Sequence, residues 1–163
     1  MFTKIIAGVL SFLLWIFPLS SLLGGWQARL AFDRNAVMDQ IATCVAARDV
    51  VTLESMMRPW FKTNIPDLTD KLNQFFDAID GDIVNVNKGT SQGSGNSQGI
   101  YYEELRFGIY TTDETNPHYY LWISYDVSNS KNKNDVGISW IHLQTGANSD
   151  PSHIVHFLLR IPA

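Results

Sequence analysis

Three groups of side chains in the second half of the chain have residue types that could carry chemistry. The first is His118, Asp126 and His142, which lie on segments expected to be consecutive strands. Asp126 and His142 could face each other across a strand ladder, and a buried carboxylate–imidazole pair can act as a general base. The competing interpretation is ordinary polarity on an exposed sheet face, where such residues have no catalytic role.

The second group is the pair His153 and His156, spaced i, i+3. On a helix the two rings would share a face and could bind a metal, whereas on a strand they would point to opposite sides. No third ligand is identifiable nearby, so the sequence predicts no metal site. The glycine-rich residues 89–99 lack the Gly-Lys-Ser/Thr ending of a phosphate loop, and no cofactor is expected either.

The third group is aromatic. Tyrosine and tryptophan are dense on the expected strands: Tyr101, Tyr102, Tyr110, Tyr119, Tyr120, Trp122, Tyr125 and Trp140. Half of any strand faces the core, so most of these rings are expected to pack inside. Tyr120, Trp122 and Trp140 do not fit a single buried face, and the first two share their side of the strand with His118. These four are the candidate binding residues, because exposed aromatic side chains favour a ligand or partner surface. The alternative is a second packed layer.

The elements that would position these groups begin with helices. Residues 31–48 carry apolar side chains at spacings of three and four, which predicts an amphipathic helix. Asp49 is a suitable N-cap for a short second helix over residues 50–57, which Pro59 would stop. Residues 67–79 are the clearest helix, because their leucine, phenylalanine and isoleucine side chains fall on one face.

Beyond residue 81 the apolar period changes to two, which predicts strands. The expected strands are 82–87, 100–111, 118–127 and 136–145. Residues 153–160 are a strand or a helix, and their β-branched and aromatic content favours a strand. Two polar stretches, 88–99 and 128–135, are expected to be loops, the first of them mobile. Helices followed by an antiparallel meander predict an α+β fold, with N-terminal helices packed on one face of a curved antiparallel sheet.

The charge of the chain argues against one class of partner. Of its 163 residues, 12 are basic and 16 acidic, and residues 1–30 hold two of the basic ones, Lys4 and Arg29. The ten basic and sixteen acidic residues that remain give a net charge of −6, so no nucleic-acid partner is expected. Such a domain suits cationic or neutral partners. The single cysteine, Cys44, cannot form an internal disulfide and is expected to be a small buried apolar residue.

The N-terminal segment predicts export. Lys4 is followed by an uncharged, largely apolar run from Ile5 to Trp26. Such a run can be a cleaved signal peptide or a retained transmembrane anchor, and both alternatives stay open. We expect residues 1–26 to be this signal or anchor, in contact with the membrane through residues 5–26. Residues 31–163 are expected to form a single α+β domain that is exported, either membrane-anchored and facing outward or secreted after cleavage.

Three stretches carry a resemblance to known groups. Residues 72–83, in which two phenylalanines precede an acidic residue, a glycine and a strand, resemble a junction in an uncharacterised family of secreted bacterial lipoprotein-like domains. Residues 137–141 fit the last central strand of that family, and residues 47–53 resemble a helix corner of the wider nuclear transport factor 2-like (cystatin-like) superfamily. The resemblance covers roughly residues 35–145. It implies helices around a bent sheet in a cone, with no reaction and no cofactor. Unlike the lipoprotein members, this chain has no cysteine for lipid attachment after its hydrophobic segment.

These expectations support two main functions. The first is a non-catalytic extracytoplasmic binding domain of the bacterial cell envelope, whose ligand could be a glycan, a peptide, or an envelope or toxin protein. The alternative is a small cone-fold enzyme that uses Asp126 and His142 as an acid–base pair. Full solvation of both side chains, or packing without a cavity, would exclude the enzyme. A structural envelope component with a flat sheet face is a third possibility.

Overall fold

The structure is a computed structural model, and it describes residues 31–89, 93–111, 117–145 and 155–160. The expected signal or anchor over residues 1–26 lies outside these ranges, as does most of the turn expected between the strands near residues 113–117. Among the described residues, no helix has both the length and the apolar character that a membrane span needs.

The helices lie in the first half of the described chain: α3 (Arg34–Ala46), α4 (Val50–Met56), α5 (Pro59–Asn64) and α6 (Leu68–Asp77). The carboxylates of Asp33 and Asp49 cap α3 and α4, accepting the N–H groups of Ala36 and Thr52 at 3.0 Å each. The three expected helices are confirmed, and α5 is an addition. Pro59 begins this extra helix, because the first turn is the place where a missing N–H costs no hydrogen bond.

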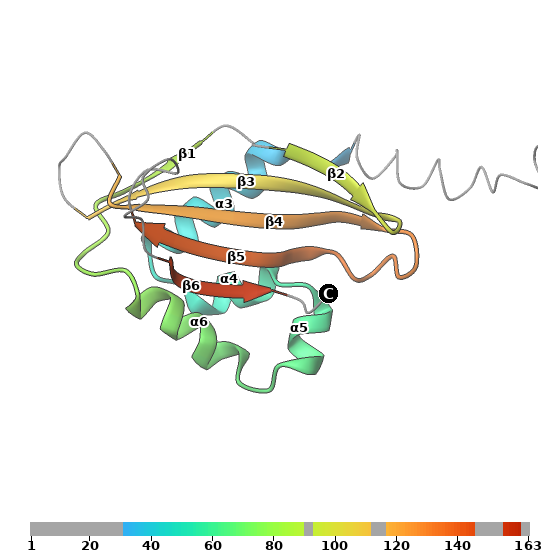
Figure 1. The fold of residues 1–163 in the computed structure, drawn as a ribbon, viewed down its shortest axis with the longest axis horizontal. Helices are drawn as coiled ribbons and strands as arrows, with labels where there is room; N and C mark the ends of the chain where they lie inside the picture. The colour runs from blue at the N-terminus through green and yellow to red at the C-terminus, as the bar shows by residue number, and fades with distance from the viewer. Residues whose placement is uncertain (1–30, 90–92, 112–116, 146–154, 161–163) are drawn as a thin grey trace, which may run out of the picture.

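The strands follow: β1 (Asn85–Lys88), β2 (Gly93–Ser97), β3 (Ile100–Tyr110), β4 (Tyr119–Asn129), β5 (Gly137–Thr145) and β6 (Val155–Arg160). They form one antiparallel sheet in the order β1-β3-β4-β5-β6, with β2 also paired to β3 (Figure 1). The structure confirms an α+β class with helices on the N-terminal side of an antiparallel sheet. It also confirms the last apolar segment as a strand.

The expected mobile loop over residues 88–99 is wrong for part of its length. β2 lies inside it and pairs with β3 along all of its five residues. Gln98 and Gly99 have positive φ values of 51° and 85°, which is the conformation that a two-residue hairpin turn needs. The sequence did not predict this strand because its residues are exposed or half-buried and so have no apolar period. Backbone pairing with β3 places it at the sheet edge.

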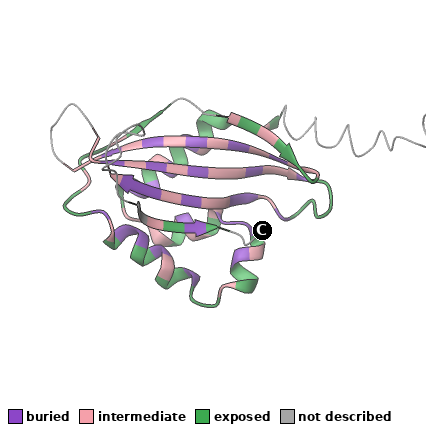
Figure 2. Cartoon of the chain, viewed as in Figure 1, coloured by how far each residue is buried: buried purple, intermediate pink, exposed green. Residues whose placement is uncertain are grey.

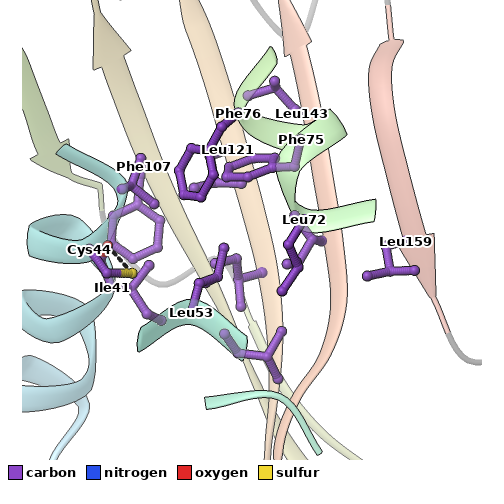
Figure 3. Close-up of a cluster of buried hydrophobic side chains, with 14 of the residues drawn as sticks. Ile41, Cys44, Leu53, Leu72, Phe75, Phe76, Phe107, Leu121, Leu143 and Leu159 are labelled. Atoms are coloured by element: carbon purple, nitrogen blue, oxygen red, sulfur yellow. Dashed lines mark hydrogen bonds between the residues drawn. The ribbon is translucent and has the colours of Figure 1, made fainter. Parts of the chain in front are cut away.

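The helices pack on one face of the sheet. Buried and half-buried residues alternate along β3 and along the first half of β4, and less regularly along β5 (Figure 2). The buried stripe meets helix side chains in one apolar core, in which Ile41, Leu53, Leu72 and Phe75 lie against Phe107 and Leu121 (Figure 3). The alternation therefore separates a face that packs on helices from a face that does not.

The second face is named the open face. In Figure 1, α3 and α4 pass behind the sheet, and no helix of the described chain lies in front of it. The strand registers place the following side chains on this face: Tyr102, Glu104 and Arg106 from β3; Tyr120, Trp122, Ser124 and Asp126 from β4; Trp140, His142 and Gln144 from β5; Leu158 and Arg160 from β6.

Arg48 holds a corner of the helix layer, between α3 and α4. Its guanidinium donates hydrogen bonds to three carbonyl groups at the end of α6, those of Phe76 (2.6 Å), Ile79 (2.9 Å) and Gly81 (2.5 Å). A cation suits this place, because the last carbonyls of a helix have no partner within the helix and carry partial negative charge. This contact joins the two stretches 47–53 and 72–83 that carry part of the resemblance, and it gives both a structural role.

Candidate functional site

A second arginine, Arg58, lies where the chain between α4 and α5 meets the start of β5. Met57 forms a parallel bridge with Ile138, and the Arg58 N–H donates to the Ile138 carbonyl at 3.0 Å. Gly137 permits this approach: it has a φ of 125°, and a Cβ there would lie 2.6 Å from the Met56 carbonyl oxygen. The close approach brings the Arg58 side chain to the sheet.

Arg58 is only 7% exposed, and it binds two buried carboxylates. Its Nη1 donates to Asp126 Oδ2 at 2.5 Å, and its Nη2 donates to Asp135 Oδ2. Asp126 also accepts from the Ser139 hydroxyl at 2.8 Å, and Asp135 accepts the Trp60 N–H at 3.2 Å. Arg58, Asp126 and Asp135 are named the Arg58 triad. The triad ties the α4–α5 corner to β4 and to the loop between β4 and β5.

The two carboxylates of the triad have different environments. Burial raises the pKa of Asp126, because the hydrogen bond from Ser139 and the charge of Arg58 offset the lost hydration only in part. The hydrogen bond from Arg58 lowers the pKa of Asp135. Burial acts to lower the pKa of Arg58, but the hydrogen bond to Asp135 and the charge of Asp126 outweigh it and raise that pKa. Asp126 is thus the member of the triad that accepts a proton most readily.

A groove of about 470 Å³ lies on the open face beside the triad. This is within the range of about 300–1,000 Å³ that is usual for ligand pockets. Its lining comes from the β2–β3 hairpin, all the central strands and the end of β6: Arg58, Ser97, Gln98, Ile100, Tyr102, Glu104, Ser124, Asp126, Ser139, Trp140 and Arg160. It is named the Trp140 groove. Asp126 and Ser139 are named its floor, and the aromatic residues Tyr102 and Trp140 are named its aromatic wall.

A β-bulge shapes the floor of this groove. Ser124 on β4 opposes Trp140, while the next residue, Tyr125, opposes Ile138, so Ser139 is the extra residue on β5. A bulge lets two successive side chains reach the same region, and both Ser139 and Trp140 line the groove. The strict two-residue period used in the sequence analysis would put them on opposite faces, which is why Ser139 was not predicted.

The structure does not bring Asp126 and His142 together. Asp126 is opposite Gly137, whereas His142 is opposite Trp122. These positions are four residues apart along β4, about 13 Å at the usual rise of about 3.3 Å per residue. The expected pairing of Asp126 with His142 is therefore wrong. The sequence placed the two residues on consecutive strands but could not give the register, and the partner of Asp126 is Arg58 instead.

The four candidate binding residues separate in the structure. Tyr120 and Trp122 share the open face, but the Arg106 guanidinium stacks over both rings, 4.6 Å and 4.8 Å from their centroids. His118 lies just before β4, at the end of that strand away from the groove. Trp140 is the candidate that lines the groove.

Of the eleven groove residues, only Asp126 and Trp140 were candidates from the sequence, and those missed include Arg58, Tyr102 and Glu104. Arg58 had a usable signal, because it is the one charge in the apolar stretch 56–61 (Met-Met-Arg-Pro-Trp-Phe). A charge inside such a stretch has to find a partner when the stretch is buried. Its partner Asp135 had no comparable signal, since it ends a polar loop that is 77 residues away in sequence.

The metal and thiol expectations have different outcomes. Among the described residues, no group of three or more His, Cys, Asp or Glu side chains is placed to hold a metal ion. The pair His153 and His156 lies outside the described side chains. Cys44 is buried as expected, and burial raises the pKa of its thiol to about 12, which makes it a poor nucleophile.

Comparison with known proteins gives a family but no function. None of the curated proteins matches the chain. A family model described as "Domain of unknown function (DUF5104)" matches residues 40–146, which is more than half of the chain. The matched range contains the Arg48 contact, the whole Arg58 triad and Trp140. The chain therefore belongs to the DUF5104 family of domains of unknown function.

Proposed function

We propose that this chain is a non-catalytic binding domain of the bacterial cell envelope, and that it holds its ligand in the Trp140 groove. The observation that carries the proposal is the groove itself, a hollow of about 470 Å³ on a sheet face that no described helix covers. Its lining combines two aromatic side chains, Tyr102 and Trp140, with eight polar or charged ones, which can form hydrogen bonds to a polar ligand.

The floor of the groove is suited to binding because its polar groups are held in fixed positions. Asp126 is fixed by Arg58 and Ser139, and Arg58 is fixed in turn by Asp135. Side chains locked in this way lose little further entropy when a ligand arrives, so more of the contact energy remains as affinity. The enzyme alternative lacks this kind of support, since its acid–base pair is not formed and the groove lining described above contains no histidine.

The location and the superfamily belong to the same proposal. The uncharged run between residues 5 and 26 supports export with residues 1–26 as signal or anchor, and the domain then faces the outside of the cell. Helices packed on one face of a bowed antiparallel sheet support membership of the nuclear transport factor 2-like superfamily. Neither point is needed for the groove to bind.

A calorimetric comparison of groove and non-groove variants tests this function. The full chain in mild detergent is titrated with neutral oligosaccharides and with short cationic peptides, as wild type, as Trp140→Ala and as Val51→Ala. Val51 is the matched control, because it is an apolar side chain that is 79% exposed on α4 in the helix layer. We expect Trp140→Ala to weaken binding about tenfold or more and Val51→Ala to leave it unchanged.

Two results would overturn the proposal. One is binding that is equally strong in the wild type and Trp140→Ala proteins, which would place the ligand elsewhere. The other is a new product in the mass spectrum of a bound probe, formed by the wild type and not by Asp126→Asn. That product would establish the enzyme, with Asp126 as one of its catalytic groups.

A further inference from the structure

We infer that the ligand of the Trp140 groove is a neutral carbohydrate, with one pyranose ring stacked on Trp140 and its hydroxyl groups bonded to the Asp126–Ser139 floor. This inference rests on the proposed binding function and specifies the chemical class of the ligand. It is argued from the charges of the lining, the free hydrogen-bonding capacity of the floor and the placement of the two aromatic rings.

The charges of the lining cancel. Arg58 and Arg160 are cationic, while Glu104 and Asp126 are anionic. An anionic ligand would be attracted by the arginines but repelled by the two carboxylates at short range. A cationic ligand would be attracted by the carboxylates but repelled by the arginines. Like charges placed close together in a partly desolvated site are costly, so this arrangement discriminates against both. A neutral polar ligand avoids the cost and can still use donors and acceptors of both kinds.

The floor has hydrogen-bonding capacity that suits hydroxyl groups. Each carboxylate oxygen of Asp126 receives one hydrogen bond from the protein, Oδ1 from Ser139 and Oδ2 from Arg58. A carboxylate oxygen can accept two, so each retains one acceptor site. The Ser139 oxygen likewise donates to Asp126 and can still accept. A sugar hydroxyl both donates and accepts, and it can therefore bond to this pair without leaving either group unsatisfied.

The two aromatic residues come from the strands on either side of this floor, and the Tyr102 ring lies over Gly95 of β2. Tyr102 on β3 is opposite Asp126 on β4, and Trp140 on β5 is opposite Ser124 of the same strand. Their backbones are thus two strand spacings apart across the sheet, about 9.6 Å at about 4.8 Å each, and are also offset by two residues along β4, which lies between them. A pyranose ring has an apolar C–H face and a polar rim. The C–H face can pack on the electron-rich face of the indole while the rim reaches the β4 floor.

Trp140 is a better platform than the other tryptophan on this face. The rings of Trp122 and Tyr120 already carry the Arg106 guanidinium. A sugar stacking there would have to displace that cation. Trp140 is contacted from one side by the His142 ring, at 5.4 Å between centroids and a tilt of 45°, and it lines the groove. The site is therefore centred on Trp140.

The experiment is a calorimetric titration of the full chain with three neutral tetrasaccharides and one cation. The probes are cellotetraose, maltotetraose, N-acetylated chitotetraose and tetralysine, each at low and at high salt. We expect saturable binding of at least one tetrasaccharide, with a Kd that changes less than about twofold between the two salt conditions, because a neutral ligand has no charge to screen. Trp140→Ala should weaken it about tenfold or more, while Ser139→Ala should weaken it by a smaller factor.

The controls separate failure of this inference from failure of the binding function. Val51→Ala should bind like the wild type. If Trp140→Ala folds poorly, Ser139→Ala still tests the groove, because it leaves the aromatic wall intact. Binding of tetralysine alone, weakened by salt and by Trp140→Ala, would overturn the carbohydrate and leave the binding function in place. No binding of any probe, or binding that neither groove variant alters, would overturn both.

Discussion

Two arginines fix two corners of this domain, and they are paired in opposite ways. The guanidinium of Arg48 donates hydrogen bonds to three neutral backbone carbonyls at the end of α6. Arg58 gives its guanidinium to two carboxylates, and its Nε has no hydrogen-bond partner among the described residues. The first corner lies within the helix layer, and the second lies at the edge of the Trp140 groove.

The difference separates a contact that the backbone requires from one that it does not require. Carbonyl groups at a helix end need a donor in any case, so the Arg48 contact satisfies an existing requirement of the backbone. The Arg58 triad takes three charges out of water, and apolar side chains of similar volume would often stabilise such a place equally well. Stability alone therefore does not explain the triad. Under the proposed binding function its position at the groove would explain it, because a fixed carboxylate gives the floor its acceptors.

The largest effect is expected from Arg58→Met. The substitution keeps most of the side-chain volume but leaves Asp126 and Asp135 buried without their counter-charge. We expect the free energy of unfolding, measured in urea, to fall by about 3–5 kcal/mol. The control is Lys71→Met, which removes a 3.4 Å pair with Asp67 whose side chains are 38% and 53% exposed. That change should cost less than about 1 kcal/mol. Similar losses in the two variants would show that the buried carboxylates are hydrated in place.

A smaller loss is expected from Gly137→Ala at the same corner. The alanine would have to adopt a φ of 125°, and its Cβ would lie 2.6 Å from a backbone oxygen, that of Met56. We expect about 2–3 kcal/mol less stability in the same urea experiment. Gly93→Ala is the matched control, because its Cβ would meet only the end of the Glu104 side chain at 3.3 Å. A Gly137→Ala protein as stable as its control would contradict the close approach of α4 to β5.

Substitutions of Arg48 should cost less stability, and the loss has two causes: the missing hydrogen bonds and the backbone strain. Arg48→Ala removes the hydrogen bonds to the α6 carbonyls and keeps a left-handed φ of 50°, so we expect a loss of about 2 kcal/mol. Arg48→Gly loses the same bonds but relieves the backbone strain, and it should be about 1 kcal/mol more stable than the alanine variant. Thermal and urea unfolding of the pair measure both parts. Equal stability of the two variants would mean that the left-handed backbone conformation at residue 48 does not lower the free energy of unfolding.

Much of the fold was predictable because it follows local rules. The Asp49 cap, the apolar face of α6 and the alternation along β4 are each visible within a dozen residues of sequence. β2 was not predictable in the same way, since an exposed strand of glycine, serine and asparagine has no apolar period. Its pairing depends on β3 and on the turn at Gln98 and Gly99.

The candidate site was predictable only in part because it depends on contacts between distant segments. The apolar period placed Trp140 outside the single buried face without help from the structure. It could not supply the bulge that turns Ser139 toward the groove, nor the register that separates Asp126 from His142. The partner Arg58 comes from another layer, 68 residues away from Asp126 in sequence. The periodicity of apolar residues cannot predict a contact between side chains so far apart in sequence.

The smallest effect is expected from pH, and it distinguishes the two carboxylates of the triad. The pKa of Asp135 is lowered in the folded state, so its contribution to stability is present above the unfolded value of about 3.9 and is lost as the pH falls through the folded pKa. The pKa of Asp126 is raised, so its contribution is present below about 3.9 and is lost as the pH rises through the folded pKa.

Removing each carboxylate should therefore change the pH dependence in opposite ways. Asp135→Asn should make the loss of stability on acidification less steep, whereas Asp126→Asn should reduce the loss that accompanies a rise above about pH 4. Urea unfolding between about pH 3 and pH 7 measures both slopes. Arg48→Gly should leave them unchanged, since the carbonyl acceptors of Arg48 do not titrate. If both substitutions change the slope in the same direction, the two carboxylates titrate as one coupled unit. Asp126 would then have no pKa of its own that distinguishes it from Asp135.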